Sequence, residues 1–166
     1  MYYLPFQSNV LVAGWQASAI LTATTGPFIT PATGFDRVGM LDNNRPDLAA
    51  SCTNLVLGNT QHWFNASCFA LPAVGVPGTA TRTSIPGPHL TTLDFSVLKD
   101  TKIARVSENF NIQLRAEFFN LLNHANYGLP NANVFSANGN PSALYGSITT
   151  AVGTARQIQF GLKLLF

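Results

Sequence analysis

The last ten residues of the chain alternate almost strictly between apolar and polar positions. Side chains of a β-strand point alternately to its two faces, so this period of two predicts a strand with one apolar and one mostly polar face. Its length is that of a tilted transmembrane strand, about 9–11 residues. The apolar face holds Ile158, Phe160, Leu162, Leu164 and Phe166, and the other face holds Gln157, Gln159, Gly161, Lys163 and Leu165.

The same alternation predicts a strand over Glu108–Phe119 and another over about Leu90–Lys99. Leu, Arg, Ala and Glu also favour a helix over Leu114–Leu122, but the alternation starts well before that stretch, so we favour the strand. Asp100-Thr101-Lys102 supplies turn-forming residues between the two segments. The pair is therefore predicted to form a hairpin with a compact turn.

A fourth strand is predicted over about Gly14–Thr24, where only Ile20 breaks the alternation. Tyr2–Phe6 is interpreted as the tail of an earlier strand that turns through Gln7-Ser8-Asn9. The fold prediction is therefore all-β, with about four to five antiparallel strands.

The predicted connections alternate in length. Those near Gln7–Ala13 and Asp100–Ser107 are short, whereas Thr25–Gly87 and Asn120–Thr154 are long and rich in Gly, Pro, Asn, Ser and Thr. Loops of this length are uncommon in compact soluble domains. Outer-membrane barrels have short periplasmic turns and long extracellular loops. The pattern predicts a fragment of an antiparallel transmembrane β-barrel with two long extracellular loops.

Composition supports the membrane interpretation. Only 10% of the residues are charged, against about 25% in typical globular domains. No uninterrupted apolar run approaches the roughly 18 residues of a membrane helix. A secreted β-sandwich shares much of this composition and stays open as an alternative.

In a barrel the outward side chains must be apolar, while the lumen tolerates charge. The candidate lumen-facing polar residues are Asp94, Arg115, Glu117 and Lys163. Aromatic residues near strand ends, such as Trp15 and Phe166, suit the interfacial girdles.

Cys52 and Cys68 lie in one predicted loop, on the extracellular side. They can pair in an oxidising compartment, and closing such a loop contributes roughly 3 kcal/mol in the chain-entropy model. Two free thiols remain the alternative. Neither cysteine has the Cys or His neighbours that a zinc site needs, so no metal or other cofactor is expected.

The scattered basic residues give no electrostatic footprint for nucleic acid. The histidines lie isolated in loop-like sequence, without a nucleophile elbow, a phosphate-binding glycine loop or a two-histidine helix motif, so no catalytic residue is assigned and an enzyme is not expected. His62, Trp63 and Phe64 are candidate ligand contacts in the first long loop, although a locally packed loop core is the favoured interpretation.

Several stretches, taken together and in order, resemble TonB-dependent outer-membrane transporters of the large Oar-like class, which is abundant in Acidobacteria. They are Gly14-Trp15-Gln16-Ala17-Ser18, Arg45-Pro46-Asp47-Leu48, Trp63-Phe64-Asn65, Leu93-Asp94-Phe95-Ser96-Val97, Arg115-Ala116-Glu117-Phe118-Phe119-Asn120-Leu121-Leu122-Asn123-His124 and the final segment from Arg156 to Phe166.

The resemblance implies a large barrel of about 22 strands with a plug, driven by TonB. Residues 1–166 correspond to the C-terminal part of the barrel, and the plug and N-terminal domains have no counterpart in them. The implied partners are outer-membrane lipid, the barrel-assembly machinery, the remainder of the barrel and plug, and TonB through upstream parts. Met1 is not followed by a secretory signal, which is therefore expected upstream.

The resemblance also implies a barrel-assembly signal in the final strand. Gln159, Gly161, Leu164 and Phe166 match its polar, glycine and apolar places. A final strand with free edge groups can template pairing during barrel closure.

The leading hypothesis is a segment of a nutrient importer in the Gram-negative outer membrane, for a metal chelate or an oligosaccharide. The alternatives are a surface adhesion or structural protein anchored by a barrel, and a secreted β-rich binding module. Four or five strands are fewer than the about eight of the smallest barrels, so these residues alone are not expected to insert stably as a monomer.

Overall fold

The computed structural model describes residues 2–5, 9–41, 44–105 and 110–166. The chain forms two compact units. The sheet unit comprises Met1–Ala23, Thr91–Ala125 and Gly153–Phe166, and the loop unit comprises Thr24–Leu90 and Asn126–Val152. Among the described residues, no helix has the length and apolar character needed to cross a membrane.

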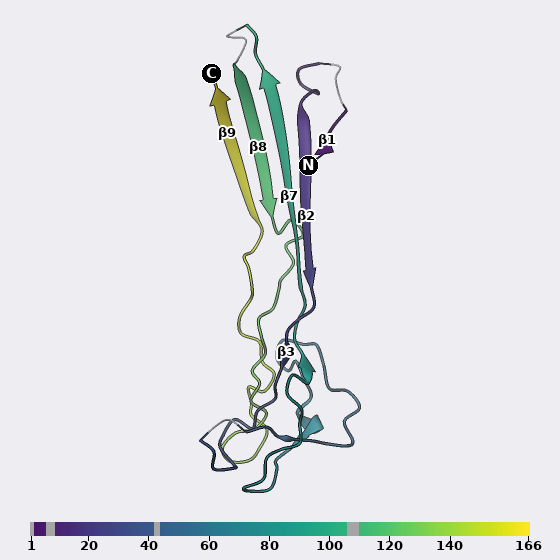
Figure 1. Cartoon of the computed structure of the whole chain (residues 1–166), viewed down its shortest axis with the longest axis vertical. Coiled ribbons are helices and arrows are strands. Elements are labelled where there is room, and N and C mark those ends of the chain that lie inside the picture. Colours follow the sequence, from purple (N-terminus) through teal and green to yellow (C-terminus); the bar gives the residue numbers. More distant parts are fainter. Residues whose placement is uncertain (1, 6–8, 42–43, 106–109) are drawn as a thin grey trace. The chain divides into compact units, whose positions relative to one another are not determined.

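The sheet unit is built on one five-stranded sheet in the order β1-β2-β7-β8-β9, and the sheet does not close on itself (Figure 1). Its strands are β1 (Tyr2–Tyr3), β2 (Trp15–Thr24), β7 (Leu90–Lys102), β8 (Asn111–Phe119) and β9 (Gln157–Leu165). The prediction of an all-β antiparallel fold is confirmed, and β8 excludes the alternative helix over Leu114–Leu122. Glu108, where the β8 strand was predicted to begin, and Phe6 and the Gln7-Ser8 part of the first turn lie outside the described residues.

One prediction at the β7–β8 connection is wrong. Asp100, Thr101 and Lys102 were expected to form the turn, but β7 continues through them. Asp100 is opposite Gln113, and Lys102 is opposite Asn111. The extension has a side-chain cause, since the Asp100 carboxylate accepts hydrogen bonds from Gln16 at 3.0 Å and Gln113 at 2.9 Å. Turn-forming residues thus stay in a strand when neighbouring strands satisfy their side chains.

The register of the sheet separates apolar from polar side chains. Phe95, Phe118 and Ile158 stand in one row, and Leu114 and Leu162 are paired on the same face. A slip by one residue would turn every side chain of a strand to the other face, so this alignment fixes the pairing. All nine residues of β9 are exposed, because β9 is the edge strand and neither of its faces is covered within the chain.

The loop unit contains short elements that the sequence did not reveal. Strand β3 (Phe28–Ile29) pairs with β6 (Ile85–Pro86), and β4 (Asp47–Leu48) pairs with β5 (Phe69–Ala70). A 3-10 turn, η1 (Ala66–Cys68), precedes β5, and the Asn65 side chain caps it by accepting from the Ser67 amide. These pieces satisfy backbone groups that a compact loop would otherwise bury without partners.

The loop unit also has its own apolar core. The buried members are Ile29, Phe64, Ala66, Cys68, Phe69, Ala80, Ile85, Val134 and Phe135. Val134 and Phe135 come from the second long loop and the others from the first. The two loops are joined by backbone as well, through the parallel bridge between Ala32 and Asn133 and the 2.8 Å hydrogen bond from the Trp63 amide to the Gly146 carbonyl. The two predicted loops are therefore one folded unit.

Candidate functional site

Polar side chains form ordered rows across one face of the sheet unit. Asp100, Gln113 and Lys163 are consecutive in one row, and Ser96, Glu117 and Gln159 in another. The predicted lumen-facing residues Arg115, Glu117 and Lys163 therefore share this polar face with Asp94, which lies two residues before Ser96 on β7. A shallow hollow of about 340 Å³ is lined by Arg115, Glu117 and Lys163 together with Gln113, Gln159 and Gly161.

The ion pair on this face is loose. Arg115 Nη1 lies 3.5 Å from Glu117 Oε1, and the Arg115 side chain is 48% exposed. Exposed pairs of this kind contribute about 0–1 kcal/mol, so the pair adds little stability and both groups remain accessible to solutes.

Asp94 has a positioning role at the end of β8. Its carboxylate accepts a 2.9 Å hydrogen bond from the amide of Asn120, which is buried and has a φ of 49°. The Asn120 side chain in turn donates to the His124 and Thr154 carbonyls and accepts from the His124 amide. These bonds hold the chain where it leaves β8, and they explain why Asn is suited to this left-handed position.

The apolar face carries two aromatic contacts at the end of the sheet where the short connections lie. The ammonium of Lys99 is 5.5 Å from the centroid of the Trp15 ring, and it donates a 2.7 Å hydrogen bond to the Val10 carbonyl. Phe110 and Phe166 have ring centroids 5.6 Å apart. A Trp side chain beside a Lys whose ammonium group reaches a backbone carbonyl is typical of a boundary between apolar and polar surroundings.

The glycine of the predicted assembly signal meets no steric demand within the chain. A Cβ added to Gly161 would lie 3.9 Å from the Cβ of Arg115, which is ordinary van der Waals contact. Of the other three members, Phe166 contacts Phe110, and Gln159 and Leu164 are opposite Glu117 and Ile112. The strand therefore tolerates other residues at position 161.

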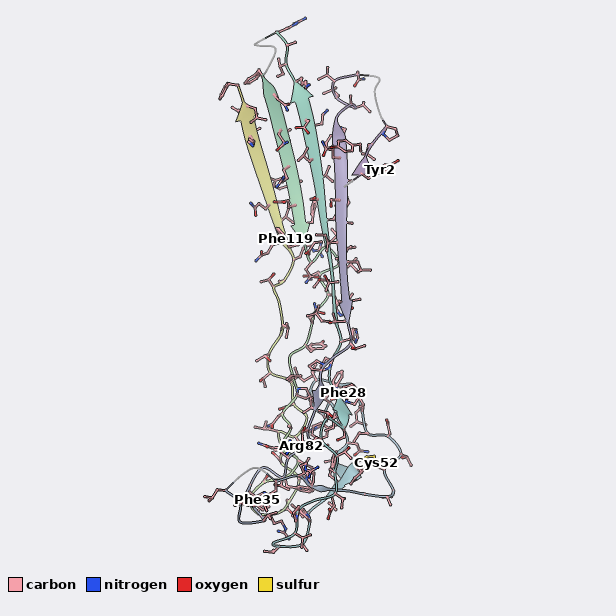
Figure 2. All side chains as sticks on the ribbon, viewed as in Figure 1. Tyr2, Phe28, Phe35, Cys52, Arg82 and Phe119 are labelled. Carbon is pink, nitrogen blue, oxygen red and sulfur yellow. A yellow bond between two sulfur atoms is a disulfide. The ribbon has the colours of Figure 1, made fainter. Side chains whose placement is uncertain are left out.

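Cys52 and Cys68 form a disulfide in the loop unit, with an S–S distance of 2.04 Å (Figure 2). The bond links residues 16 positions apart, and the buried Cys68 lies in the apolar core. The disulfide thus ties residue 52 of the first long loop to the apolar core of the loop unit.

The three candidate ligand contacts of the first long loop lie side by side but face different surroundings. Phe64 is fully buried and meets Phe69 edge-on at 5.9 Å, so it offers no surface to a ligand. The Trp63 indole donates to the Pro86 carbonyl at 2.8 Å. His62 stacks on Tyr145, with ring centroids 4.3 Å apart. Phe64 is thus a member of the apolar core, and Trp63 is packed against that core.

Sequence analysis missed a hollow in the loop unit. It has a volume of about 520 Å³, and Arg45 and Arg82 line it. The two arginines are far apart in the sequence and carry no shared motif, so no pattern along the chain predicts that they lie in one hollow.

Asp100 of the polar sheet face was missed for a different reason, because it was assigned to a turn. Among the described residues, no three His, Cys, Asp or Glu side chains are grouped as a metal site requires.

One carboxyl group of the loop unit has a shifted pKa. The amides of Gly39 and Leu41, followed by that of Val38, hydrogen-bond the Asp36 carboxylate and hold its pKa below the ordinary value. Because these bonds favour the charged form, the turn over residues 36–41 is stabilised while Asp36 is ionised.

Comparison with known proteins gives one positive result. The family model described as "Outer membrane beta barrel domain" matches residues 1–159. The comparisons with curated proteins and with solved structures found no match.

Proposed function

Because the chain belongs to the outer membrane beta barrel domain family, and its strands are those of an antiparallel barrel in the outer membrane, we propose that it forms part of a transporter for nutrient uptake. The apolar face of β2, β7, β8 and β9 contacts lipid, and the polar face lines the lumen. The loop unit is extracellular and takes part in capturing the nutrient. In this proposal the transporter is of the TonB-dependent, Oar-like type, and its nutrient is a metal chelate or an oligosaccharide.

The observation that carries the proposal is the register of β7, β8 and β9. It aligns Asp100 with Gln113 and Lys163, and Glu117 with Gln159, on the face opposite the apolar side chains. A polar inner face is what a solute-conducting or plugged barrel requires. The proposed partners are therefore lipid, the remaining strands and plug, the barrel-assembly machinery and, through the plug, TonB. No nucleic acid and no catalytic role are proposed.

The test is an uptake experiment in the bacterium that carries the gene. Deleting the gene is expected to remove energy-dependent uptake of one scarce nutrient from a panel of iron chelates and oligosaccharides. An uncoupler of the proton gradient is expected to have the same effect on the parent strain. Complementation with the intact gene provides the control. Unchanged uptake of every nutrient in the panel would exclude the proposal.

The TonB-dependent part has a separate test. The DNA immediately upstream of the Met1 codon is expected to continue in frame into further alternating strands and a plug. An in-frame stop codon upstream, followed by a ribosome-binding site directly before the Met1 codon, would argue against it.

A second candidate is a barrel that anchors a surface-binding domain. The observation in its favour is that the loop unit has its own core and disulfide. The gene deletion separates the two candidates, because loss of attachment to surfaces with unchanged nutrient uptake would favour the anchor.

A further inference from the structure

The loop unit contains a hollow whose polar lining is cationic. Its volume, about 520 Å³, falls within the range of small-molecule sites, about 300–1,000 Å³. Arg45 and Arg82 line it together with the polar side chains of Thr30 and Asn44. Val38 and Met40 add apolar surface. No described lining residue carries a carboxylate.

The guanidinium of Arg82 is available to a solute. Its side chain, labelled in Figure 2, makes no hydrogen bond or ion pair with any residue that the structure describes. The backbone next to it is held in place, since the Thr83 amide donates a 3.0 Å hydrogen bond to the Thr30 hydroxyl. Arg82 is therefore an unpaired cation on a fixed backbone position.

Arg45, the second arginine of the lining, is held by a backbone contact. Its Nη1 donates a 2.8 Å hydrogen bond to the Ala80 carbonyl. A guanidinium has five N–H donors, so the remaining ones stay available for an anion.

Close backbone packing holds the segment around Gly78, which lines the hollow together with the two arginines. The Ala80 amide donates to the Pro46 carbonyl at 2.9 Å, and both Ala80 and Pro46 are buried. A Cβ on Gly78 would lie 2.1 Å from the Arg45 carbonyl oxygen, so only glycine permits this approach. The backbone that carries Arg45 and Gly78 beside the hollow is thus part of the folded unit.

The two described carboxylates of the loop unit accept hydrogen bonds from backbone amides. Asp47 accepts a 2.8 Å hydrogen bond from the Thr79 amide. Asp36 accepts from the amides of its own turn, those of Val38, Gly39 and Leu41. Neither forms a described ion pair with Arg45 or Arg82.

We propose that this hollow binds a small solute carrying two or more anionic oxygen groups, with Arg45 and Arg82 as its cationic contacts. Planar guanidinium forks match carboxylate and phosphate oxygens and bind both of them through paired hydrogen bonds. The inference rests on the proposed uptake function, since it names the chemical class of the solute that the extracellular unit captures.

The test is equilibrium binding to outer membranes from cells that produce the protein as its gene encodes it. Radiolabelled citrate probes carboxylate recognition, pyrophosphate probes phosphate recognition, and raffinose serves as a neutral solute. Saturable binding of citrate or pyrophosphate is expected, with no binding of raffinose. Binding should weaken as sodium chloride is raised, because salt screens exposed charge pairs.

Variants of Arg82 decide whether the hollow is the site. Arg82→Gln is expected to weaken binding about tenfold, the effect of losing one charge-assisted hydrogen bond. Arg82→Lys keeps the positive charge and loses the planar pair of N–H donors. Its affinity for the anion should lie between those of Arg82→Gln and the parent protein. Arg105→Gln is the matched control, because Arg105 is an exposed residue of the sheet unit. The amide exchange of the loop unit should be the same in all three variants.

Three results would overturn the inference: no saturable binding of either anion, unchanged binding in Arg82→Gln, or an equal loss in Arg105→Gln. Different results would overturn the proposed transport function and the anion site. A nutrient-uptake defect in the deletion strain without anion binding would leave the transporter and remove this site. Anion binding without any uptake defect would leave the site and remove the transporter.

Discussion

Replacing Phe64 with alanine is expected to loosen the whole loop unit. Phe64 is fully buried, and its ring meets Phe69 from the same loop and Tyr145 from the second loop, each with centroids 5.9 Å away. Buried Phe→Ala substitutions cost about 3–5 kcal/mol, and the cost is highest where the surroundings cannot collapse into the cavity. The disulfide at the buried Cys68, a member of the same core, restricts such collapse. We therefore expect about 4 kcal/mol.

Amide hydrogen exchange followed by mass spectrometry measures this loss. The amides of Asn65 and Ala80 are hydrogen-bonded to Leu55 and Pro46, and they exchange when the unit opens. At about 1.4 kcal/mol per factor of ten, the loss predicts exchange on the order of 1,000-fold faster. The full protein in outer membranes or detergent is the sample, so the unit keeps its natural attachments.

Phe28→Ala is the matched control. Phe28 belongs to the same unit, undergoes the same chemical change and is 61% exposed. Its substitution is expected to change exchange by no more than about twofold, within the roughly 0.5 kcal/mol of surface substitutions. Equal acceleration in both variants, or no acceleration in Phe64→Ala, would refute the idea that the two long loops share one cooperative core.

Three further predictions concern single features. Replacing both Cys52 and Cys68 with alanine should destabilise the loop unit by about 3 kcal/mol, the loop-closure value for a separation of this size, and the exchange assay above detects it. Gly161→Ala should leave the heat-induced gel-mobility transition of the barrel unchanged and lower the amount of protein that reaches the outer membrane. A lower transition temperature would instead show that the glycine is needed for packing. For Asp36, the pKa in the folded protein lies below the unfolded value of 3.8. The ionised carboxylate therefore stabilises its turn fully above about pH 3.8, and this stabilisation is lost as the pH falls through the lower folded pKa. Asp36→Asn should remove this acid dependence from the hydrogen exchange of the Gly39 amide.

The strands of the sheet could be predicted from sequence because lipid and lumen impose opposite demands on alternate residues. The predicted span Gln157–Phe166 differs from β9 by one residue at its end, and Gly14–Thr24 differs from β2 by one at its start. The boundary of β7 was missed because Asp100 is turn-forming in isolation. Its partners Gln16 and Gln113 are remote in sequence, and their hydrogen bonds override that local preference.

The interior of the loop unit was much harder to predict. Its strands are two residues long, too short to show a period, and its core joins Phe64 to Val134 and Phe135 across the intervening strands. The pairing of Cys52 with Cys68 was left open because two cysteines in one loop say nothing of their separation in space. No sequence pattern indicates the arginine-lined hollow, because it depends on the packing of the Gly78 segment against Arg45 and Pro46.

The shared core of the two loops has a consequence for recombination between related barrels. Ala32 is bridged to Asn133, and Trp63 is bonded to Gly146, so neither loop retains its partners if it is exchanged alone. A crossover that transfers only the first loop would leave Val134 and Phe135 facing a foreign surface. Inheritance of a new specificity therefore requires two separate segments to travel together, which constrains how such surface units diversify.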